Sequence, residues 1–476
     1  MEMSKRMTAA LLCCSILLAG CGRSAASSSE PAVQTKPAVA TEAVTETTTV
    51  TEAATETSAE RKTTERTTAE DTTTVSETQT AYIISAATTQ PAQSRVTTRA
   101  QNYTTTTAPT TTAVTTTAVT TSAVPPVDRT PEEQLSVMSL RQKVGQMFMI
   151  TPEQFTTVYP MTAVGSVTEN MMMNYPVGGV IYLAPNIVSD SQIKKMISDT
   201  QAYAKKSSNG VGIFTALDEE GGSITRVRQK LNKTPTSDMA VYGARNNYNE
   251  AYNVGKTIGS YLKPLGFNVD LAPVADVNID SRNELGTRIF SSDANVVANM
   301  VAAVSKGLKD TGVCATLKHF PGLGAESGNT HNDSFVVIDR SLEQLRETEF
   351  VAFKGGIDAG ADLVMVGHQI TTGFGDNLPA DLSYVAITEM LRGELGFNGV
   401  VITDSQQMNT ILNVYTSGQA AKMSVKAGAD IILAPKSITE AIDAVCAAVE
   451  SGEIPESRID ESALRILRLK KELGLF

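Results

Sequence analysis

The sequence has no tryptophan, only 3 histidines and only 5 cysteines among its 476 residues. The absence of tryptophan excludes a sugar-binding platform built from indole rings. Five cysteines in so long a chain exclude a scaffold held together by disulfides. With so few histidines and no Cys-x-x-Cys pair, a zinc site is not expected, and we predict that the chain holds no metal ion.

The sequence also lacks an excess of positive charge. Lys and Arg number 40 against 51 Asp and Glu, which gives a net charge of −11. Because phosphate binding needs clustered cations, nucleic acid is not an expected partner. No Gly-x-x-x-x-Gly-Lys motif occurs, and no Gly-x-Gly-x-x-Gly follows a strand pattern and opens a helix. Nucleotide cofactors are therefore not indicated, and no other cofactor is expected.

Residues 1–20 have the pattern of a secretory signal. Lys5 and Arg6 precede an apolar run from Met7 to Leu18 that is too short to span a membrane. The ending Leu18-Ala-Gly-Cys21 resembles the lipobox of bacterial lipoproteins, in which Cys21 becomes the lipid-modified N-terminus. The alternative is an ordinary signal peptide with a chance cysteine. The lipoprotein interpretation predicts anchorage to the bacterial cell membrane, with the remainder of the chain at the cell surface.

Residues 21–127 are dominated by Thr, Ser, Ala and Glu and contain almost no Leu or Phe. Such a stretch cannot bury enough apolar surface to offset the entropy lost on ordering. Thr-rich segments of this kind act as stalks or linkers and are sometimes O-glycosylated. We predict a disordered tether rather than a domain.

Residues 128–476 have the pattern of one large α/β domain. Order is predicted to begin at Thr130, because Pro131 and Glu133 follow it as in a capped helix. Short apolar runs then alternate with amphipathic stretches such as 341–354 and 437–450. The eight runs are 147–150, 179–182, 212–215, 269–273, 314–317, 361–366, 399–402 and 429–433. Eight such strands at this length predict a single (β/α)8 barrel of the TIM type, with an open doubly wound sheet as the alternative.

A barrel of this type should carry its reactive residues just after the strands, at the C-terminal face. Asp218, Asp276, the pair Lys318-His319, His368 and Asp404 all follow predicted strands. Asp404 is a candidate nucleophile or general base, although a lone acid after a strand can also cap a helix. Two cysteines in apolar surroundings, Cys314 and Cys446, are predicted to be buried free thiols.

Several of these segments resemble glycoside hydrolase family 3, in its single-domain β-N-acetylglucosaminidase branch. Lys318-His-Phe-Pro-Gly-Leu-Gly324 followed by Asn329-Thr-His331 resembles the family signature, and three further blocks occur in the family's order. These blocks are 218–226, 283–290 and 399–404. The resemblance covers essentially all of 128–476. It implies a (β/α)8 barrel and retaining hydrolysis of terminal β-linked N-acetylhexosamine from peptidoglycan fragments or chitin-type oligosaccharides.

The resemblance also implies residue roles. Asp404 matches the catalytic nucleophile, and His331 matches an unusual acid/base in which an imidazole replaces the second carboxylate. The sugar-binding clamp matches Asp218, Arg226, Arg288, Lys318 and His319. A clamp of cations and one acid needs no indole surface, in agreement with the missing tryptophan. The alternatives are that Arg226 and Arg288 form ion pairs at the barrel rim and that His319 only orients its loop.

Two positions depart from the family pattern. Asn329 stands where the family usually has an aspartate that orients the acid/base histidine, and a neutral amide cannot supply its charge. We therefore expect a lowered pKa of His331 and weakened acid catalysis, unless Asp333 or Glu326 supplies the charge. Leu323 stands where the motif commonly has histidine. His368 is expected to support the site without contacting the sugar.

Three other functions stay open. A family 3 β-glucosidase or β-xylosidase is one, although the usual two-domain form of those enzymes has a further sheet domain beyond the barrel, and none is expected here. Transfer of the sugar to phosphate is a second, because a neutral acid/base residue does not repel an anionic acceptor. The third is a non-catalytic surface glycan-binding lipoprotein weakened by Asn329. The catalytic domain is expected to be monomeric.

Overall fold

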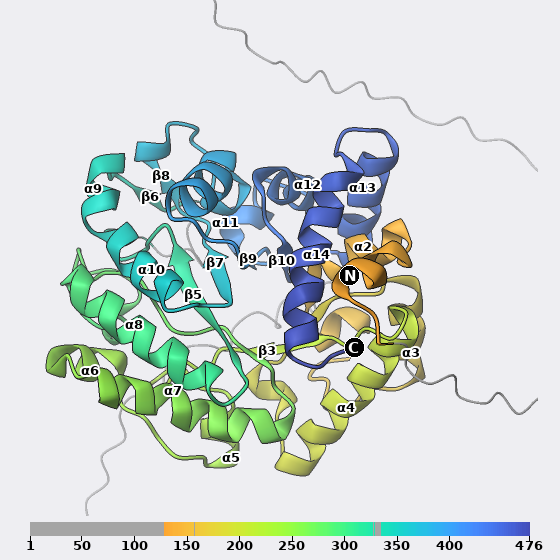
Figure 1. The fold of residues 1–476 in the computed structure, drawn as a ribbon, viewed down its shortest axis with the longest axis horizontal. Helices are drawn as coiled ribbons and strands as arrows, with labels where there is room; N and C mark the ends of the chain where they lie inside the picture. Colours follow the sequence, from red (N-terminus) through yellow and green to blue (C-terminus); the bar gives the residue numbers. More distant parts are fainter. Residues whose placement is uncertain (1–127, 157, 327, 329–334) are drawn as a thin grey trace, which may run out of the picture. The chain divides into compact units, whose positions relative to one another are not determined.

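Eight parallel strands close into a barrel in the computed structural model (Figure 1). The structure describes residues 128–476 apart from 157, 327 and 329–334, so the predicted signal, Cys21 and the tether lie outside the described residues. Strand β1 pairs in parallel with β10 as well as with β2, which closes the sheet and excludes the open alternative. The strands are β1 (Phe148–Ile150), β2 (Gly179–Ile181), β3 (Phe214–Leu217), β4 (Val269–Asp270), β5 (Cys314–Phe320), β7 (Leu363–Val366), β9 (Val400–Ser405) and β10 (Ile431–Leu433).

All eight predicted runs form barrel strands, although the limits of each strand differ from the prediction by one to three residues at one or both ends. Strand β3 begins two residues later than predicted, at Phe214. Strand β5 continues to Phe320, with an irregular register between Leu317 and Phe320. Strand β9 continues to Ser405. Lys318, His319 and Asp404 therefore lie in the ends of strands rather than after them, because backbone pairing continues into the polar segments that face the barrel mouth.

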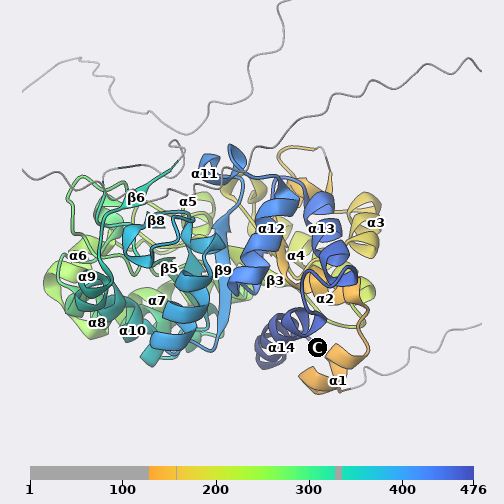
Figure 2. The same ribbon diagram turned by 90° about the horizontal axis from the view of Figure 1, so that it is seen from above.

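Helices surround the barrel, and each barrel strand is followed along the chain by at least one helical segment (Figures 1 and 2). Helices α1 and α14 lie at one end of the barrel, whereas α5, α11 and β6, which follow β3, β9 and β5, lie at the other (Figure 2). The helices are α1 (Pro131–Ser136), α2 (Leu140–Gln146), α3 (Ser166–Asn174), α4 (Asp190–Ser207), α5 (Val227–Leu231), α6 (Met239–Arg245), α7 (Tyr248–Leu262), α8 (Ala294–Lys309), α9 (Leu342–Glu347), α10 (Glu349–Asp358), α11 (Asn409–Leu412), α12 (Ser417–Ala427), α13 (Ile438–Glu450) and α14 (Glu456–Glu472).

Short segments complete the chain between these elements. A π-helical segment, η7 (Val385–Glu394), takes the helix position between β7 and β9. Strand β6 (Val337–Ile338) pairs with β8 (Ile370–Thr371) outside the barrel. The 3-10 turns are η1 (Pro152–Phe155), η2 (Ala184–Asn186), η3 (Lys263–Leu265), η4 (Gly286–Arg288), η5 (Thr372–Phe374) and η6 (Ala380–Leu382).

Local sequence explains where the helices begin and which side they bury. Thr130 and Glu133 form the predicted capping box at the start of α1. The Asp293 side chain accepts from the Asn295 N–H at the start of α8, and the buried positions of that helix recur at helical spacing. They include Val297, Met300, Val301, Val304 and Leu308. The predicted amphipathic stretch 341–354 forms two helices instead of one, because the backbone of Thr348 departs from helical geometry between α9 and α10.

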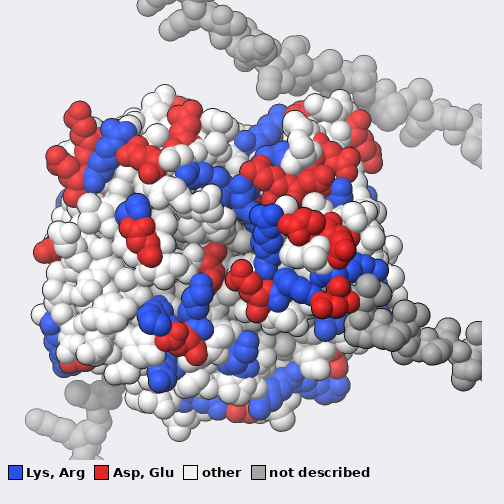
Figure 3. All heavy atoms as spheres, viewed as in Figure 1, with Lys and Arg blue, Asp and Glu red and all other residues white. Residues whose placement is uncertain are grey.

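Charged groups of both signs are interspersed on the face shown in Figure 3. No single sign covers this face, and several pairs bridge neighbouring helices, such as Lys143 with Glu456 at 3.0 Å. Cys314 and Cys446 are buried free thiols, as predicted. Within the described ranges, none of the helices has both the length and the apolar character needed to cross a membrane.

A buried ion network ties the last helix to the barrel. Asp430, fully buried just before β10, accepts from Arg392 at 2.5 Å and from Arg465 at 3.2 Å. The same carboxylate accepts from the Val401 N–H at 2.9 Å and from the Ser462 hydroxyl at 2.6 Å. This one acid thus joins η7, β9 and α14, far from the loops that follow the strands.

Replacing this acid should destabilise the fold. We expect Asp430→Asn to lower the free energy of unfolding by about 3 kcal/mol, because the arginines around it lose their buried counter-charge. Urea unfolding followed by circular dichroism measures the change. Asp443→Asn, which breaks the half-exposed Arg141–Asp443 pair, is the control and should shift the midpoint much less. Equal shifts in the two variants would contradict the role given to Asp430.

Candidate active site

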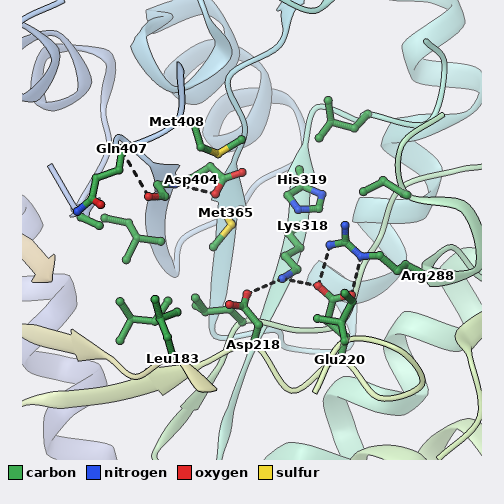
Figure 4. A pocket seen from close by; sticks show the side chains of 18 of the residues that line it. Leu183, Asp218, Glu220, Arg288, Lys318, His319, Met365, Asp404, Gln407 and Met408 are labelled. Carbon is green, nitrogen blue, oxygen red and sulfur yellow. Dashed lines mark hydrogen bonds and ion pairs between the residues drawn. The ribbon is translucent and has the colours of Figure 1, made fainter. Parts of the chain in front are cut away.

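A cavity of about 440 Å³ lies at the C-terminal ends of the barrel strands (Figure 4). Its lining includes residues from the end of every barrel strand or from the segment that follows it. The polar lining residues are Thr151, Asp218, Glu220, Arg226, Glu284, Arg288, Lys318, His319, Asp404, Ser405 and Gln407. The predicted clamp residues and Asp404 are all among them, so the fold brings together six side chains that are spread over 187 positions from 218 to 404.

Ion pairs connect most of the clamp. The Lys318 ammonium lies 2.9 Å from Asp218 Oδ1 and 2.7 Å from Glu220 Oε1 (Figure 4). Arg288 donates two hydrogen bonds to Glu220, both of 2.8 Å. Arg226 lies 3.5 Å from Asp218 Oδ2. The predicted alternative of rim ion pairs is therefore compatible with the clamp, because Arg288 forms such a pair and also lines the cavity.

The ion pairs keep the buried Glu220 and Lys318 side chains charged. Burial alone would raise the pKa of Glu220, but Lys318 and Arg288 outweigh it and lower the pKa to about 2. Burial likewise disfavours the charged form of Lys318, yet Asp218 and Glu220 raise its pKa above the ordinary value. Glu220 and Lys318 are therefore both ionised over the whole physiological pH range.

Glu219 shapes the loop that presents Arg226. Its carboxylate accepts hydrogen bonds from the backbone N–H groups of residues 226, 227 and 228, at 2.6–2.8 Å. The Tyr261 hydroxyl donates to the same carboxylate at 2.9 Å. Gly222 adopts φ +51°, and a Cβ there would lie 2.1 Å from Asp238 Oδ1. The loop after β3 can therefore pack only with glycine at this position.

Asp276 orients His319. One carboxylate oxygen accepts from the His319 backbone N–H at 3.0 Å and lies 2.8 Å from its Nδ1. The other accepts from the Leu323 N–H at 2.6 Å. The ring is thereby fixed with its far edge toward the cavity, so His319 both orients its loop and lines the site. The two predicted interpretations of His319 are compatible.

Asp404 lies near the end of β9, close to Met365 and Met408 (Figure 4). The Ser405 N–H donates to Asp404 Oδ1 at 2.7 Å. Burial raises the pKa of Asp404, but the rings of His368 and His319, this N–H and Lys318 outweigh it, so the pKa lies below its ordinary value. A carboxylate kept ionised in a cavity can act as a nucleophile or as a base.

The family can now be decided by comparison with known proteins. The family model described as "Glycosyl hydrolase family 3 N terminal domain" matches residues 139–469. The chain belongs to glycoside hydrolase family 3. The family resemblance predicted from the sequence is thus confirmed.

Relatives of this family 3 chain are named for aminosugar hydrolysis. Beta-hexosaminidase A of Pseudoalteromonas piscicida is 28% identical over 340 residues, covering 66% of this chain and 56% of the relative. Beta-hexosaminidase LpqI of Mycobacterium tuberculosis is 30% identical over 310 residues, covering 63% and 77%. The solved family 3 β-N-acetylglucosaminidase of Paenibacillus sp. str. FPU-7 superposes with TM-score 0.66 at 35% identity, covering 71% of this chain and 63% of that one. The chain thus spans just over half the length of the first relative.

Two predicted site residues of the family 3 motif, and the acid expected to compensate for one of them, fall in the segment 329–334. Asn329, His331 and Asp333 lie outside the described residues. Leu323, where the motif commonly has histidine, is 4% exposed and belongs to a small apolar cluster. The other members of that cluster are Val274, Leu285, Ile289, Val336 and Ile338. The departure at Leu323 therefore exchanges a polar group for packing at the base of the loop.

Two features of the site were not predicted from the sequence. Glu220 is the partner of both Lys318 and Arg288, and its position two residues after Asp218 was the available signal, because alternate residues of an extended segment face one side. The second feature is Asp381, which lies 3.0 Å from His368 and carries no motif. Among the described residues, no group of three or more His, Cys, Asp or Glu side chains is placed to hold a metal ion.

Proposed function

We propose that this family 3 chain is a retaining exo-β-N-acetylglucosaminidase that removes terminal β-linked N-acetylhexosamine from peptidoglycan fragments or chitin-type oligosaccharides. The observation that carries the proposal is Asp404, a carboxylate with a lowered pKa in a cavity that also contains the ion-paired cluster of Asp218, Glu220, Lys318 and Arg288. A volume of about 440 Å³ is within the range of small-molecule sites. The names of the relatives support the choice of sugar.

The reaction proceeds in two displacements. Asp404 attacks the anomeric carbon, the bond to the leaving oxygen breaks, and His331 gives that oxygen a proton. The product of this step is a covalent glycosyl ester on Asp404. Water, deprotonated by His331, then attacks the same carbon from the opposite face and releases Asp404, so the β configuration is retained.

The clamp orients the sugar by charge and hydrogen bonds. Asp218 accepts from sugar hydroxyls, whereas Lys318, Arg226, Arg288 and His319 donate to them. Because Lys318 is nearly buried and paired with two acids, its position is fixed before the sugar binds. Prior fixation lowers the entropic cost of orientation, since no side chain has to be immobilised on binding.

The location of the enzyme is also a proposal. The sequence Leu18-Ala-Gly-Cys21 after a basic and apolar start supports a lipid anchor at Cys21 in the bacterial cell membrane. The Thr-rich residues 22–127 would then hold a monomeric catalytic domain outside the cell. Labelling of the expressing cells with a radioactive fatty acid tests the anchor, and Cys21→Ala should abolish incorporation.

Turnover of aryl glycosides tests the proposed activity. We expect kcat/KM for an aryl β-N-acetylglucosaminide to exceed that for the matching β-glucoside by about 100-fold or more, because a site built to bind a polar group discriminates strongly against its absence. Preference for the glucoside or xyloside would favour the related glycosidases. Added phosphate that yields sugar 1-phosphate would identify transfer to phosphate. Binding without turnover would favour a glycan-binding protein.

Asn329→Asp tests the departure next to the acid/base. A carboxylate beside the His331 ring should raise its pKa, and the catalytic acid form then persists to higher pH. We expect the basic limb of the kcat/KM profile to move up by about one pH unit. Asn329→Ser, which stays neutral, is the control and should not move that limb. An unchanged limb in Asn329→Asp would show that Asp333 or Glu326 already supplies the charge.

A further inference from the structure

His368 and Asp381 form a buried pair that does not line the cavity. His368 follows β7 and Asp381 lies in η6, and each side chain is 0% exposed. Neither is among the lining residues, so neither contacts a sugar bound in the cavity. Burying two charged groups costs desolvation energy, which an ion pair offsets only in good geometry. The pair contacts Ser405, the residue that follows the proposed nucleophile Asp404, and this position points to a role in the reaction.

Both ring nitrogens of His368 face acceptors. Nε2 lies 2.9 Å from the Ser405 carbonyl oxygen, and Nδ1 lies 3.0 Å from Asp381 Oδ1. A carbonyl and a carboxylate accept only, so a hydrogen on each ring nitrogen, which makes the ring an imidazolium, fits both contacts. Within the described part of the chain, Nδ1 and Oδ1 have no aligned hydrogen bond to any group. Attraction between their opposite charges is therefore what compensates for their burial.

The pair fixes the end of the strand that holds Asp404. The Ser405 carbonyl is held by His368, and the Ser405 N–H donates to Asp404 Oδ1 at 2.7 Å. The next residue, Gln406, donates through Nε2 to Asp381 Oδ2 at 3.4 Å. Asp381 thus contacts both the His368 ring and Gln406. Together these contacts hold Ser405 and Gln406, the two residues that follow Asp404.

The charges around the His368 ring favour its protonated form. Burial lowers the pKa of His368, but Asp381, Asp404 and the Ser405 carbonyl outweigh it and raise the pKa to about 9. From β5, His319 and Lys318 act on Asp404, and burial together with nearby Asp381 raises the pKa of Tyr415. Without this cation the pKa of Asp404 would rise, because His368 lowers it more than any other neighbouring group does. A protonated Asp404 could not attack.

We propose that His368, held by Asp381, is a positioning residue for the nucleophile: it fixes Ser405, whose N–H orients Asp404, and its positive charge keeps that carboxylate ionised. The inference rests on the proposed function, because it takes Asp404 as the attacking group. It also separates the three histidines by role. His319 lines the cavity and His331 is the proposed acid/base, whereas His368 donates no proton in the reaction.

His368→Gln tests this role, because glutamine can still donate to the Ser405 carbonyl but carries no charge. We expect kcat to fall about tenfold on the acidic limb of its pH profile while KM changes less than about threefold. The acidic limb of the kcat profile should move up by about one pH unit, so the loss shrinks as the pH rises. A loss confined to KM, or one that is equal at every pH, would overturn the proposal.

Two further variants separate charge from stability. Asp430→Asn destabilises the opposite end of the barrel and should leave the acidic limb in place. The double variant His368→Gln/Asp381→Asn removes both buried charges together and serves where the single variant does not fold. Its acidic limb should still lie above that of the wild type, because the cation is absent. An acidic limb at the wild-type pH would overturn the proposal.

Nuclear magnetic resonance measures the charge without any substrate. Protein labelled with ¹⁵N-histidine has three rings to observe, and His368→Gln assigns one of them. We expect the His368 ring to carry both hydrogens at pH 7.5 and to titrate at about 9. Titration near the ordinary 6.5 would overturn the inference, whether or not a sugar is turned over. A charged His368 in a protein that turns over no aryl glycoside would instead overturn the proposed function.

Discussion

Asp404→Asn is expected to lower kcat for an aryl β-N-acetylglucosaminide by about 10⁴-fold. Asparagine has nearly the same shape as aspartate, but its neutral amide does not form the glycosyl ester. The Ser405 N–H, which donates to Asp404 at 2.7 Å, can still donate to the amide oxygen, so the strand end should keep its geometry. KM should therefore change little, and steady-state kinetics separates the two parameters.

Asp404→Gly with added azide tests the same role from the opposite direction. Glycine leaves space behind the anomeric carbon, where azide can attack as the aryl oxygen departs. The product should be the α-glycosyl azide, because azide approaches from the face that Asp404 would use. Urea unfolding of both variants checks that the fold is retained. A kcat only about tenfold lower in Asp404→Asn, together with no azide product, would show that another group is the nucleophile.

The barrel could be predicted because its strands are buried on both faces. Strands such as β1, β7 and β10 consist entirely of buried apolar residues, which makes each a short apolar run that sequence patterns detect. The limits of β5 and β9 could not be predicted in the same way. Lys318 and His319 near the end of β5, and Asp404 and Ser405 at the end of β9, are polar and line the cavity, so an apolar pattern stops before the strand does.

The sequence motifs predicted the residues of the clamp but not the acid that pairs with two of its cations. Sequence blocks identified Lys318 and Arg288 but gave no reason why two cations should stay charged so near each other. Glu220 between them gives that reason, and only the folded loop after β3 shows it. His368 and Asp381 are 13 positions apart in the chain and lie in irregular segments, where no periodicity reveals that they pair. Such partners follow from tertiary packing rather than from local pattern.

Glu220→Gln should have the largest effect outside the nucleophile. The Glu220 side chain is 2% exposed and accepts from Arg288 while pairing with Lys318, so the neutral amide leaves the buried Lys318 and the partly buried Arg288 without this counter-charge. We expect the free energy of unfolding to fall by about 3 kcal/mol. We also expect kcat/KM to fall about 100-fold, because Lys318 and Arg288 no longer hold fixed positions. Urea unfolding and aryl glycoside kinetics measure the two effects.

The difference in unfolding free energy between wild type and Glu220→Gln should depend on pH if the charge of Glu220 causes it. Lys318 and Arg288 lower the pKa of Glu220 from its ordinary 4.5 to about 2 against the effect of burial. The stabilisation is therefore complete above about pH 4.5 and is lost as the pH falls toward 2, where the protonated acid resembles glutamine. Glu453→Gln is the matched control: Glu453 also joins two lysines, Lys422 and Lys426, but on the exposed surface, and its loss should barely move the midpoint. A difference between wild type and Glu220→Gln that stays constant from pH 7 to about pH 3 would show that packing, not charge, gives Glu220 its role.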